Sequence, residues 1–178
     1  MQTTHTTQNT TNKFHPVIQR IFESREMDSS DIKEFLSWDL KDLPDLTSMK
    51  DMDKASTRIL QAIENDEKIA IYGDYDVDGT TSCALLYHFF KMLDTEVGLI
   101  QPSRFIEGYG IHPPSVEKAK ENGYKVLITV DCGITNNEAA DKAKEIGIDL
   151  IITDHHKDAR EEMPDAFAIL NPNRRGEP

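Results

Sequence analysis

The sequence predicts an α/β fold with a mostly parallel sheet, helices on both faces of that sheet, and a short helical segment ahead of it. Short apolar runs alternate with helical patterns from residue 68 onward, as they do in βαβ units. These runs are almost continuously apolar, which is typical of strands buried on both faces. The predicted strands are residues 68–72, 97–101, 125–130, 149–153 and 166–170.

Helices are predicted between these strands, at residues 80–93, 115–122 and 136–146. Gly123 and Gly147 follow the last two, and glycine is the usual residue where a helix ends in a left-handed conformation. The remaining divisions follow from composition and spacing. We expect a disordered tail over residues 1–12, a helical N-terminal segment over 13–66, and the α/β domain over 67–178.

The composition predicts a soluble protein with one good-sized domain in 178 residues. Hydrophobic content is 38% and mean hydropathy is −0.54, and no run approaches the roughly 20 apolar residues of a membrane span. The first residues have neither the basic nor the apolar region of a secretory signal. Cys83 and Cys132 lie in predicted core elements, so we expect two reduced thiols in a cytoplasmic protein.

The net charge of −12 argues against broad binding to nucleic acid. That argument weakens if the carboxylates bind divalent cations, because each ion cancels two negative charges where a phosphate substrate would lie. The charge therefore bounds the affinity for nucleic acid without excluding a phosphate substrate.

Three alternating aspartates follow the first predicted strand, at Asp74, Asp76 and Asp78. Carboxylates this close repel one another, and a bound cation relieves the repulsion, so all three are candidate metal ligands. An EF-hand calcium loop is the first alternative, but it requires a Glu at its twelfth position, where this chain has Leu85. A solvated cluster of surface charges is the second alternative.

The local geometry predicted for this segment is an extended chain that then turns into a helix. Alternation along an extended chain would put the carboxylates of Asp76 and Asp78 on the same side. Gly79 would permit a tight turn into the helix. Thr80 and Thr81 would then stand at the helix N-terminus, which is a natural place for a phosphate oxygen, so both are candidate substrate-binding residues.

Two more predicted strands end in possible metal ligands. Asp131 follows the third strand, and Asp154, His155 and His156 follow the fourth. Because parallel strands end at a common edge of the sheet, we expect one divalent-metal site there. An Asp in the place of Asp131 often caps the next helix instead, but that helix begins nearer Asn136, which can cap it.

The two adjacent histidines are expected to have different tasks, since neighbouring side chains point in different directions. We assign His155 to a metal ion and His156 to the substrate phosphate or leaving oxygen. Asp154 would fix an imidazole tautomer or hydrogen-bond to the loop, in support of catalysis. The alternative is a pair of ordinary solvated histidines.

The long loop over residues 102–114 is a candidate substrate-binding segment. Tyr109 lies between glycines and could stack on a base, while Arg104 could hold a phosphate. The competing interpretation is a structured loop with an exposed tyrosine. Gly133, in the turn after the third strand, joins these two as a candidate substrate contact.

Together these segments resemble the DHH phosphoesterase superfamily, and in finer detail its RecJ branch of single-strand-specific DNA exonucleases. The resemblance rests on an aspartate motif after the first strand, an Arg-Phe-Ile-Glu-Gly-Tyr-Gly loop, Asp-Cys-Gly after the third strand and Asp-His-His after the fourth. It covers nearly everything after the Thr-rich tail, including the stretches 50–55 and 168–173.

The resemblance implies phosphodiester hydrolysis that releases nucleotides from the 5′ end of single-stranded DNA. It implies that Asp76, Asp78, Asp131 and His155 bind metal, that Asp74 belongs to the same motif, and that His156 contacts the scissile phosphate. The ligand set suits Mn²⁺ or Mg²⁺, with two ions in the complete enzyme. Two alternatives stay open. The same chemistry could act on short oligonucleotides, cyclic dinucleotides or polyphosphate, or the chain could be a non-catalytic remnant that binds DNA or a partner.

Two departures from the family pattern qualify this expectation. Tyr72 stands where some superfamily members have a histidine, which removes one possible ligand. The sequence also stops before the further ligand aspartate and the second domain with which family members continue. We therefore expect a truncated nuclease domain whose activity is impaired.

Overall fold

The computed structural model describes residues 14–37, 39, 41, 45–157 and 162–177, so the predicted tail lies outside the described residues. The chain divides into two compact units, Met1–Asp45 and Leu46–Pro178. In the first unit, α1 spans Pro16–Ser24 and α2 spans Ser29–Phe35. Asp28 and Asp31 form a reciprocal capping box that satisfies backbone N–H groups at the start of α2.

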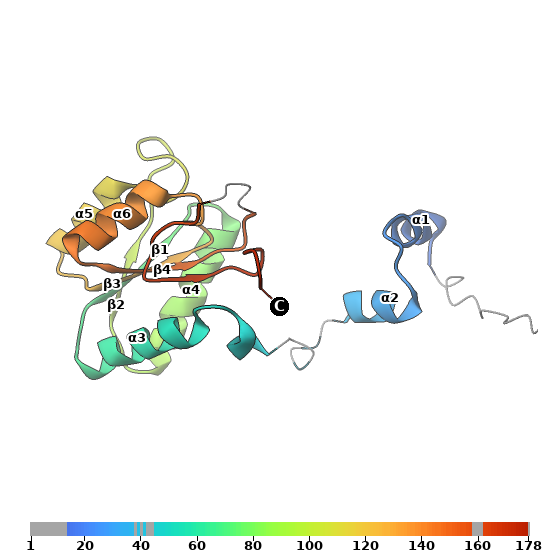
Figure 1. Cartoon of the computed structure of the whole chain (residues 1–178), viewed down its shortest axis with the longest axis horizontal. Coiled ribbons are helices and arrows are strands. Elements are labelled where there is room, and N and C mark those ends of the chain that lie inside the picture. Colours follow the sequence, from blue (N-terminus) through green and yellow to red (C-terminus); the bar gives the residue numbers. More distant parts are fainter. Residues whose placement is uncertain (1–13, 38, 40, 42–44, 158–161, 178) are drawn as a thin grey trace, which may run out of the picture. The chain divides into compact units, whose positions relative to one another are not determined.

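The second unit contains a five-stranded sheet in which every strand pair is parallel (Figure 1). The spatial order is β2-β1-β3-β4-β5, so β1 and β3 are neighbours although β2 lies between them in sequence. The strands are β1 Ile69–Gly73, β2 Val97–Ile100, β3 Val126–Val130, β4 Asp149–Thr153 and β5 Ala168–Leu170. The α/β fold class with a parallel sheet is therefore confirmed.

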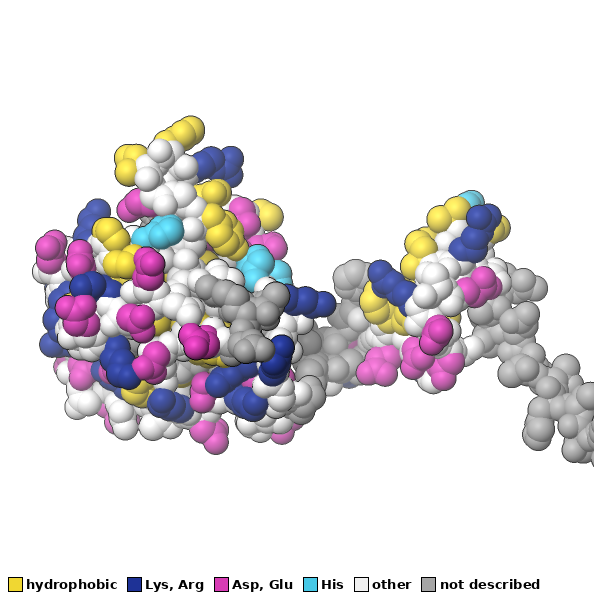
Figure 2. Space-filling model, turned by 45° about the horizontal axis from the view of Figure 1, so that its top comes forward, with side chains coloured by type: hydrophobic (Ala, Val, Ile, Leu, Met, Phe, Trp, Pro, Cys, Tyr) yellow, Lys and Arg dark blue, Asp and Glu magenta, His cyan; other side chains and the backbone are white. Residues whose placement is uncertain are grey.

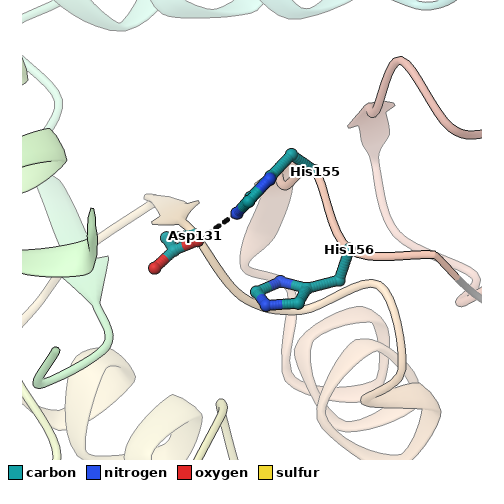
Figure 3. A group of neighbouring side chains, drawn as sticks. All are labelled: Asp131, His155 and His156. Atoms are coloured by element: carbon teal, nitrogen blue, oxygen red, sulfur yellow. Dashed lines mark hydrogen bonds and ion pairs between the residues drawn. The ribbon is translucent and has the colours of Figure 1, made fainter. Parts of the chain in front are cut away.

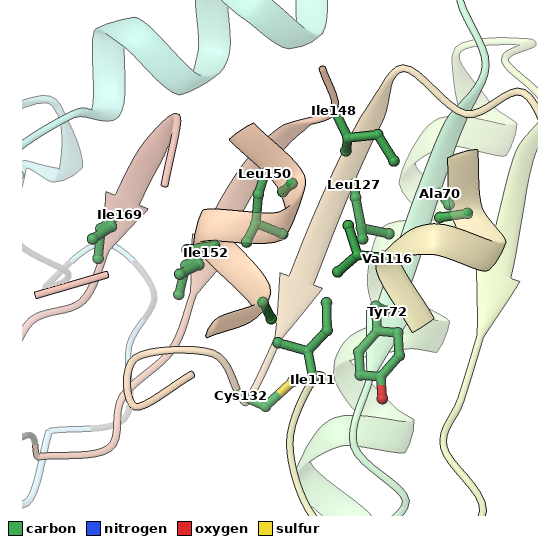
Figure 4. Packing of buried hydrophobic residues seen from close by; sticks show 14 of the residues in the cluster. Ala70, Tyr72, Ile111, Val116, Leu127, Cys132, Ile148, Leu150, Ile152 and Ile169 are labelled. Carbon is green, nitrogen blue, oxygen red and sulfur yellow. The ribbon is translucent and has the colours of Figure 1, made fainter. Parts of the chain in front are cut away.

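Helices cover both faces of the sheet (Figure 1). On one face, α5 (Pro113–Glu121) and α6 (Asn137–Ile146) pack over a cluster of buried side chains that includes Leu127 and Ile152, drawn in Figure 4. On the other face, α3 (Met52–Glu64) and α4 (Val77–Met92) bury Ala62 and Phe90 against the alternate strand residues. A short 3₁₀ helix, η3 (Leu46–Ser48), precedes α3.

The helix α3 belongs to the sheet unit, although its residues lie within the 13–66 stretch that the sequence analysis separates as an N-terminal segment. Ala55 and Ala62 are fully buried against the sheet face. Arg58, on the same helix, forms ion pairs with Glu67 and with Asp149 at the start of β4. Small apolar residues at helical spacing therefore let α3 approach the sheet closely, and the two units divide between Asp45 and Leu46.

The largest difference from the predicted elements is the start of α4, which begins at Val77 instead of residue 80. Asp76 has the extended conformation that the sequence suggested, with φ of −81° and ψ of −173°, but Asp78 lies in the first turn of the helix, so the two carboxylates do not alternate along an extended chain. Asp76 occupies the N-cap position, where its carboxylate accepts hydrogen bonds from the backbone N–H groups of Asp78 and Gly79, both at 3.0 Å. Among the described residues, none of the helices combines the length and the apolar character needed to cross a membrane.

Gly79 lies in the first turn of α4 because that turn packs directly on the backbone of Asp74. A Cβ atom at Gly79 would lie 2.4 Å from the carbonyl oxygen of Asp74 and 2.7 Å from its nitrogen. Backbone atoms cannot move aside as a flexible side chain can. The glycine is thus required for the close approach of α4 to the end of β1.

We predict that Gly79→Ala lowers the free energy of unfolding by about 1–3 kcal/mol, as overpacking does. Elsewhere in a helix the same change commonly stabilises by up to about 1 kcal/mol. Thermal and denaturant unfolding would measure the effect. Lys91→Ala, at an exposed position of the same helix, serves as the control and should change stability by less than about 0.5 kcal/mol. A Gly79→Ala variant as stable as the parent would contradict the packing argument.

Candidate metal centre

The polar strand ends lie in one row at the carboxyl edge of the sheet. Gly73 of β1 pairs in register with Val130 of β3, and Val130 pairs with Thr153 of β4. The next residues along the chain, Asp74, Asp131 and Asp154, therefore leave the sheet at the same level. The order of the strands reverses between β1 and β3, and such switch points are where open α/β sheets bind ligands.

Asp131 is the buried centre of this row. Its side chain is 5% exposed and accepts or shares a hydrogen bond with His155, whose Nε2 atom lies 2.9 Å from Oδ1 (Figure 3). Its backbone has φ of 60°, a left-handed conformation that aspartate tolerates better than most residues. Asp131 does not cap α6, because Asn136 occupies the N-cap position, though without a capping hydrogen bond from its side chain.

Asp154 makes several hydrogen bonds that hold two loops together. Its Oδ1 atom accepts from the backbone N–H of His155 at 2.7 Å and of His156 at 3.0 Å, and contacts His156 Nδ1 at 2.7 Å. Its Oδ2 atom accepts from the backbone N–H of Ile134, in the turn after β3. Asp154 thus orients the His156 ring and fixes the loop, the two options that the sequence analysis left open.

His156 is held at both ring nitrogens. Its Nδ1 atom faces Asp154, and its Nε2 atom lies 3.0 Å from the hydroxyl of Tyr109. The hydrogen bond to Asp154 raises the pKa of His156, which favours the imidazolium form. Burial raises the pKa of the Tyr109 phenol, so its hydroxyl keeps its proton near neutral pH.

Asp74 and Asp76 bring two more carboxylates to this corner. Asp74 is 0% exposed, and burial raises its pKa, with the negative charge of Asp76 adding to the effect. Its Oδ1 atom accepts from the Tyr75 N–H at 2.7 Å, but its buried Oδ2 atom has no hydrogen-bond partner among the described residues. An unpaired buried carboxylate oxygen is costly, and a cation would satisfy it.

The carboxylates of Asp76 and Asp131 are close enough to shift each other's pKa. Burial raises the pKa of Asp131, and repulsion by Asp76 raises it further. The hydrogen bond from the Gly79 N–H lowers the pKa of Asp76. Of these two carboxyl groups, the exposed one of Asp76 therefore holds a negative charge more readily than the buried one of Asp131. Asp78 lies in the first turn of α4 and lines the groove described below.

Thr80 and Thr81 are not at an open helix N-terminus, as the sequence suggested. The backbone N–H of Thr80 already donates to the carbonyl of Asp76 at 3.0 Å. The hydroxyl of Thr81 donates to the Val77 carbonyl at 2.7 Å, and that of Thr80 accepts from Gln101. The earlier start of α4 moves both threonines one turn into the helix, so the backbone phosphate site predicted there is absent at these positions.

The predicted substrate-binding residues differ in where they lie. Arg104 places its guanidinium 4.6 Å from the ring centre of Tyr75. The ring of Tyr109 meets Tyr75 and His156 in edge-to-face contacts, at centroid distances of 6.5 and 5.8 Å. Gly133 is buried, with φ of 117°, and a Cβ there would lie 2.9 Å from the Thr129 hydroxyl. Its place is structural, in a turn that only glycine adopts easily.

Asp131, His155 and His156 form a group whose possible ligand atoms all lie within 4.8 Å of one another (Figure 3). Carboxylate and imidazole donors suit a divalent cation such as Mn²⁺ or Mg²⁺. The unpaired oxygen of Asp74 and the repulsion between the carboxylates of Asp76 and Asp131 both favour the binding of a positive charge. The residues present therefore fit a divalent metal ion.

A groove of about 540 Å³ adjoins this group on the α4 side of the sheet. Asp78, Asp131 and His155 line it, and so does Thr81. Its other walls are largely apolar and come from the segment before α3, from α4 and from the end of β5. Asp131 and His155 of the candidate metal centre therefore lie at a groove that could receive a substrate.

Sequence reasoning missed the residues that hold the histidine loop from behind. Asn171 is 1% exposed and donates from Nδ2 to the His156 carbonyl at 2.9 Å, while its Oδ1 accepts from the Asn173 N–H. Asn173 in turn donates to the His155 carbonyl. The Asn-Pro-Asn segment after β5 was part of the family resemblance. Its contacts with the His155–His156 loop could not be inferred from the sequence, because they form only in the folded structure. Gln101 was likewise missed and donates to the Asp74 carbonyl.

Residues 68–178 match the family model described as the DHH family, N-terminal domain. The match covers the sheet, α4 to α6 and all the strand ends described above. The chain belongs to the DHH family.

Within that family the chain is similar to proteins named single-stranded-DNA-specific exonuclease RecJ. The one from Bacillus subtilis is 41% identical over 162 residues, which are 90% of this chain and 20% of the relative. The one from Escherichia coli is 32% identical over 166 residues, 90% of this chain and 27% of the relative. The chain therefore spans about a fifth to a quarter of the length of these relatives.

Two solved structures agree with this family. A crystal structure of exonuclease RecJ bound to manganese has a TM-score of 0.68 and 30% identity, over 76% of this chain and 34% of that chain. RecJ in complex with Mn²⁺ from Thermus thermophilus has a TM-score of 0.58 and 28% identity, over 70% of this chain and 17% of that one. Both neighbours are metal complexes of the same fold.

We predict that Asn171→Ala lowers the free energy of unfolding by about 1–3 kcal/mol, because it removes the side-chain partners of two part-buried backbone groups, the His156 carbonyl and the Asn173 N–H. Chemical denaturation would measure the loss, and the NMR signals of the histidine rings should show that the loop loosens. Asn173→Ala removes only the more exposed amide and should cost less. Equal stability of Asn171→Ala and the parent would show that the amide does not hold the loop.

Proposed function

We propose that this chain provides metal-binding residues of a 5′→3′ exonuclease for single-stranded DNA, which hydrolyses phosphodiester bonds. The observation that supports it best is the row of Asp74, Asp131 and Asp154 at one sheet edge, with His155 and His156 beside it. The relatives named as single-strand-specific exonucleases support the substrate class. A cytoplasmic location is part of the proposal and agrees with the two free cysteines, Cys83 and Cys132.

In this proposal Asp76, Asp131 and His155 hold the cation, and Asp74 and Asp78 complete the acidic surroundings. The carboxylate and imidazole set suits Mn²⁺ or Mg²⁺, and the manganese complexes of the related structures favour Mn²⁺ as the first ion to test. When bound, divalent ions would supply positive charge that activates water and offsets the charge on the phosphate.

The protein's own groups would position the phosphate. His156 is proposed to contact the scissile phosphate, since its partly exposed ring lies next to Asp131 and His155 and its raised pKa favours a positive charge. Asp154 keeps that ring in one orientation. The hydroxyl of Tyr109 lies 3.0 Å from His156 Nε2 and would help to hold the ring in place.

We predict that Mn²⁺ raises the melting temperature of this chain. A ligand at about 100 times its Kd stabilises by about 2.7 kcal/mol, which corresponds to roughly 5–10 °C for a protein of this size. Differential scanning fluorimetry would record the shift. Asp131→Asn and His155→Ala should abolish it, whereas His88→Ala, a histidine on α4, should not. No shift at millimolar Mn²⁺ would favour a non-catalytic remnant.

We also predict Mn²⁺-dependent release of nucleotides from the 5′ end of a single-stranded oligonucleotide. His156→Ala should lower kcat by about 10²- to 10⁴-fold if His156 contacts the reacting phosphate. Time courses on a 3′-labelled strand resolved by gel electrophoresis would measure both polarity and rate, with His88→Ala as the matched control.

Substrate length separates the proposed function from its closest alternative. The proposal expects long single strands to be cleaved in preference to dinucleotides, cyclic dinucleotides and polyphosphate. If dinucleotides are cleaved best and long strands are ignored, the chain is a short-substrate phosphodiesterase that uses the same metal centre.

A further inference from the structure

The turn formed by Arg104, Phe105, Ile106 and Glu107 displays two adjacent apolar side chains almost entirely to solvent. Phe105 is 95% exposed and Ile106 is 86% exposed. The loop projects from the body of the unit between β2 and α5 (Figure 1), and hydrophobic side chains lie beside a basic one on the projection in Figure 2. Single exposed apolar residues are ordinary, but two on the tip of one projecting turn call for a physical explanation.

The turn is closed by its own hydrogen bonds. The carbonyl of Ser103 accepts from the backbone N–H groups of Ile106, Glu107 and Gly108 at 3.1, 2.9 and 3.3 Å. The N–H of Ser103 donates to the carboxylate of Glu107 at 2.6 Å. The backbone that presents Phe105 and Ile106 is therefore ordered before any ligand arrives, which lowers the entropy cost of binding.

The base of the loop is attached to β1, the strand that ends at the metal centre. Gln101 donates to the carbonyl of Asp74 at 3.0 Å, and the buried hydroxyl of Tyr72 donates to the carbonyl of Gly110 at 2.9 Å. These two contacts fix both ends of the loop to residues within or next to the aspartate motif. The tip thus has a defined position relative to the candidate site.

Planar groups connect the tip to the metal centre. Arg104 lies over the ring of Tyr75, Tyr75 meets Tyr109 edge-to-face, and Tyr109 meets His156 in the same way. The hydroxyl of Tyr109 is engaged with His156 and its ring with two neighbours, so it is poorly placed to stack on a base. Phe105 is 95% exposed, and its ring makes no aromatic contact within the part of the chain that the structure describes.

On the basis of the proposed single-strand nuclease function, we propose that Phe105 and Ile106 bind an unpaired nucleobase of the DNA strand whose 5′ end lies at the metal centre. An aromatic ring stacks on any base, which suits an enzyme without sequence preference. In a duplex, both faces of an internal base are covered by its neighbours, so this contact favours single strands. Arg104, between the tip and the acidic centre, adds a positive charge that complements the phosphate backbone.

The test uses the full chain and a 5′-phosphorylated single strand that contains 2-aminopurine, a fluorescent base quenched by stacking, at successive positions from the 5′ end. Asp131→Asn in every protein prevents turnover during binding. We expect one position to change its fluorescence on binding, and Phe105→Ala to abolish that change and weaken the single-strand Kd by about 5- to 100-fold. Phe105→Trp should retain both.

The control is Met92→Ala, which removes an apolar side chain that is 85% exposed on α4 and should leave the affinity unchanged. The affinity for a blunt duplex should be the same in Phe105→Ala and its parent. Unchanged single-strand binding in Phe105→Ala, or loss of self-association measured by light scattering without loss of DNA binding, would overturn this inference alone. Absence of any DNA binding and hydrolysis by the otherwise unaltered chain would overturn the proposed function and this inference together.

Discussion

Repulsion among Asp74, Asp76 and Asp131 is the constraint around which the candidate site is organised. Burial withdraws water from Asp74 and Asp131 and raises the pKa of both. Of the three aspartates for which a solvated surface cluster was the alternative, Asp74 is buried, at 0% exposed, whereas Asp76 and Asp78 are exposed. Backbone N–H groups and the imidazole of His155 compensate part of the charge, and one oxygen of Asp74 stays unpaired among the described residues. A bound divalent cation would reduce the repulsion between the carboxylates and would give the unpaired oxygen of Asp74 a partner.

The sheet can hold like charges together because its own stability does not depend on them. Two separate apolar clusters, one on each face, fix the strands in register, and the polar groups begin only where the strands end. Gly73 pairs in register with Val130, and Val130 pairs with Thr153. The aspartates that follow these strand residues therefore lie side by side, although contacts between their carboxylates are not favourable in themselves. The close packing of Gly79 against Asp74 then brings the N-cap carboxylate of Asp76 into the same corner.

Much of this arrangement was predictable because strand ends are visible in a sequence. An apolar run followed by Asp marks an edge residue, and parallel topology says that such edges coincide, so the involvement of Asp74, Asp131 and His155 could be inferred. The start of α4 could not, because the pattern of three alternating aspartates suits an extended chain equally well. Only the N-cap hydrogen bonds of Asp76 reveal that the helix begins three residues earlier and carries Thr80 and Thr81 away from its open end.

Residues that act through tertiary contacts were also beyond sequence reasoning. Asn171 follows β5 and contacts a carbonyl that lies 15 positions earlier. No local pattern encodes that contact, since it depends on β4 and β5 being paired. The placement of α3 has the same cause. Its spacing predicts a helix, but only the buried Ala55 and Ala62 show that it packs on the sheet.

Asp154 holds the two adjacent histidines, His155 and His156, in positions where their rings contact different partners. Asp154 accepts both of their backbone N–H groups on a single oxygen, and the two rings lie near each other, with centroids 4.7 Å apart and planes inclined by 49°. The same oxygen contacts Nδ1 of His156, whereas His155 turns to Asp131. Because the buried carboxylate of Asp154 is committed to these bonds and to Ile134, it is unsuited to bind a metal ion itself. In the proposed function, the aspartate of the Asp-His-His motif would therefore act by holding the histidines, and the two imidazoles would contact the metal ion and the phosphate.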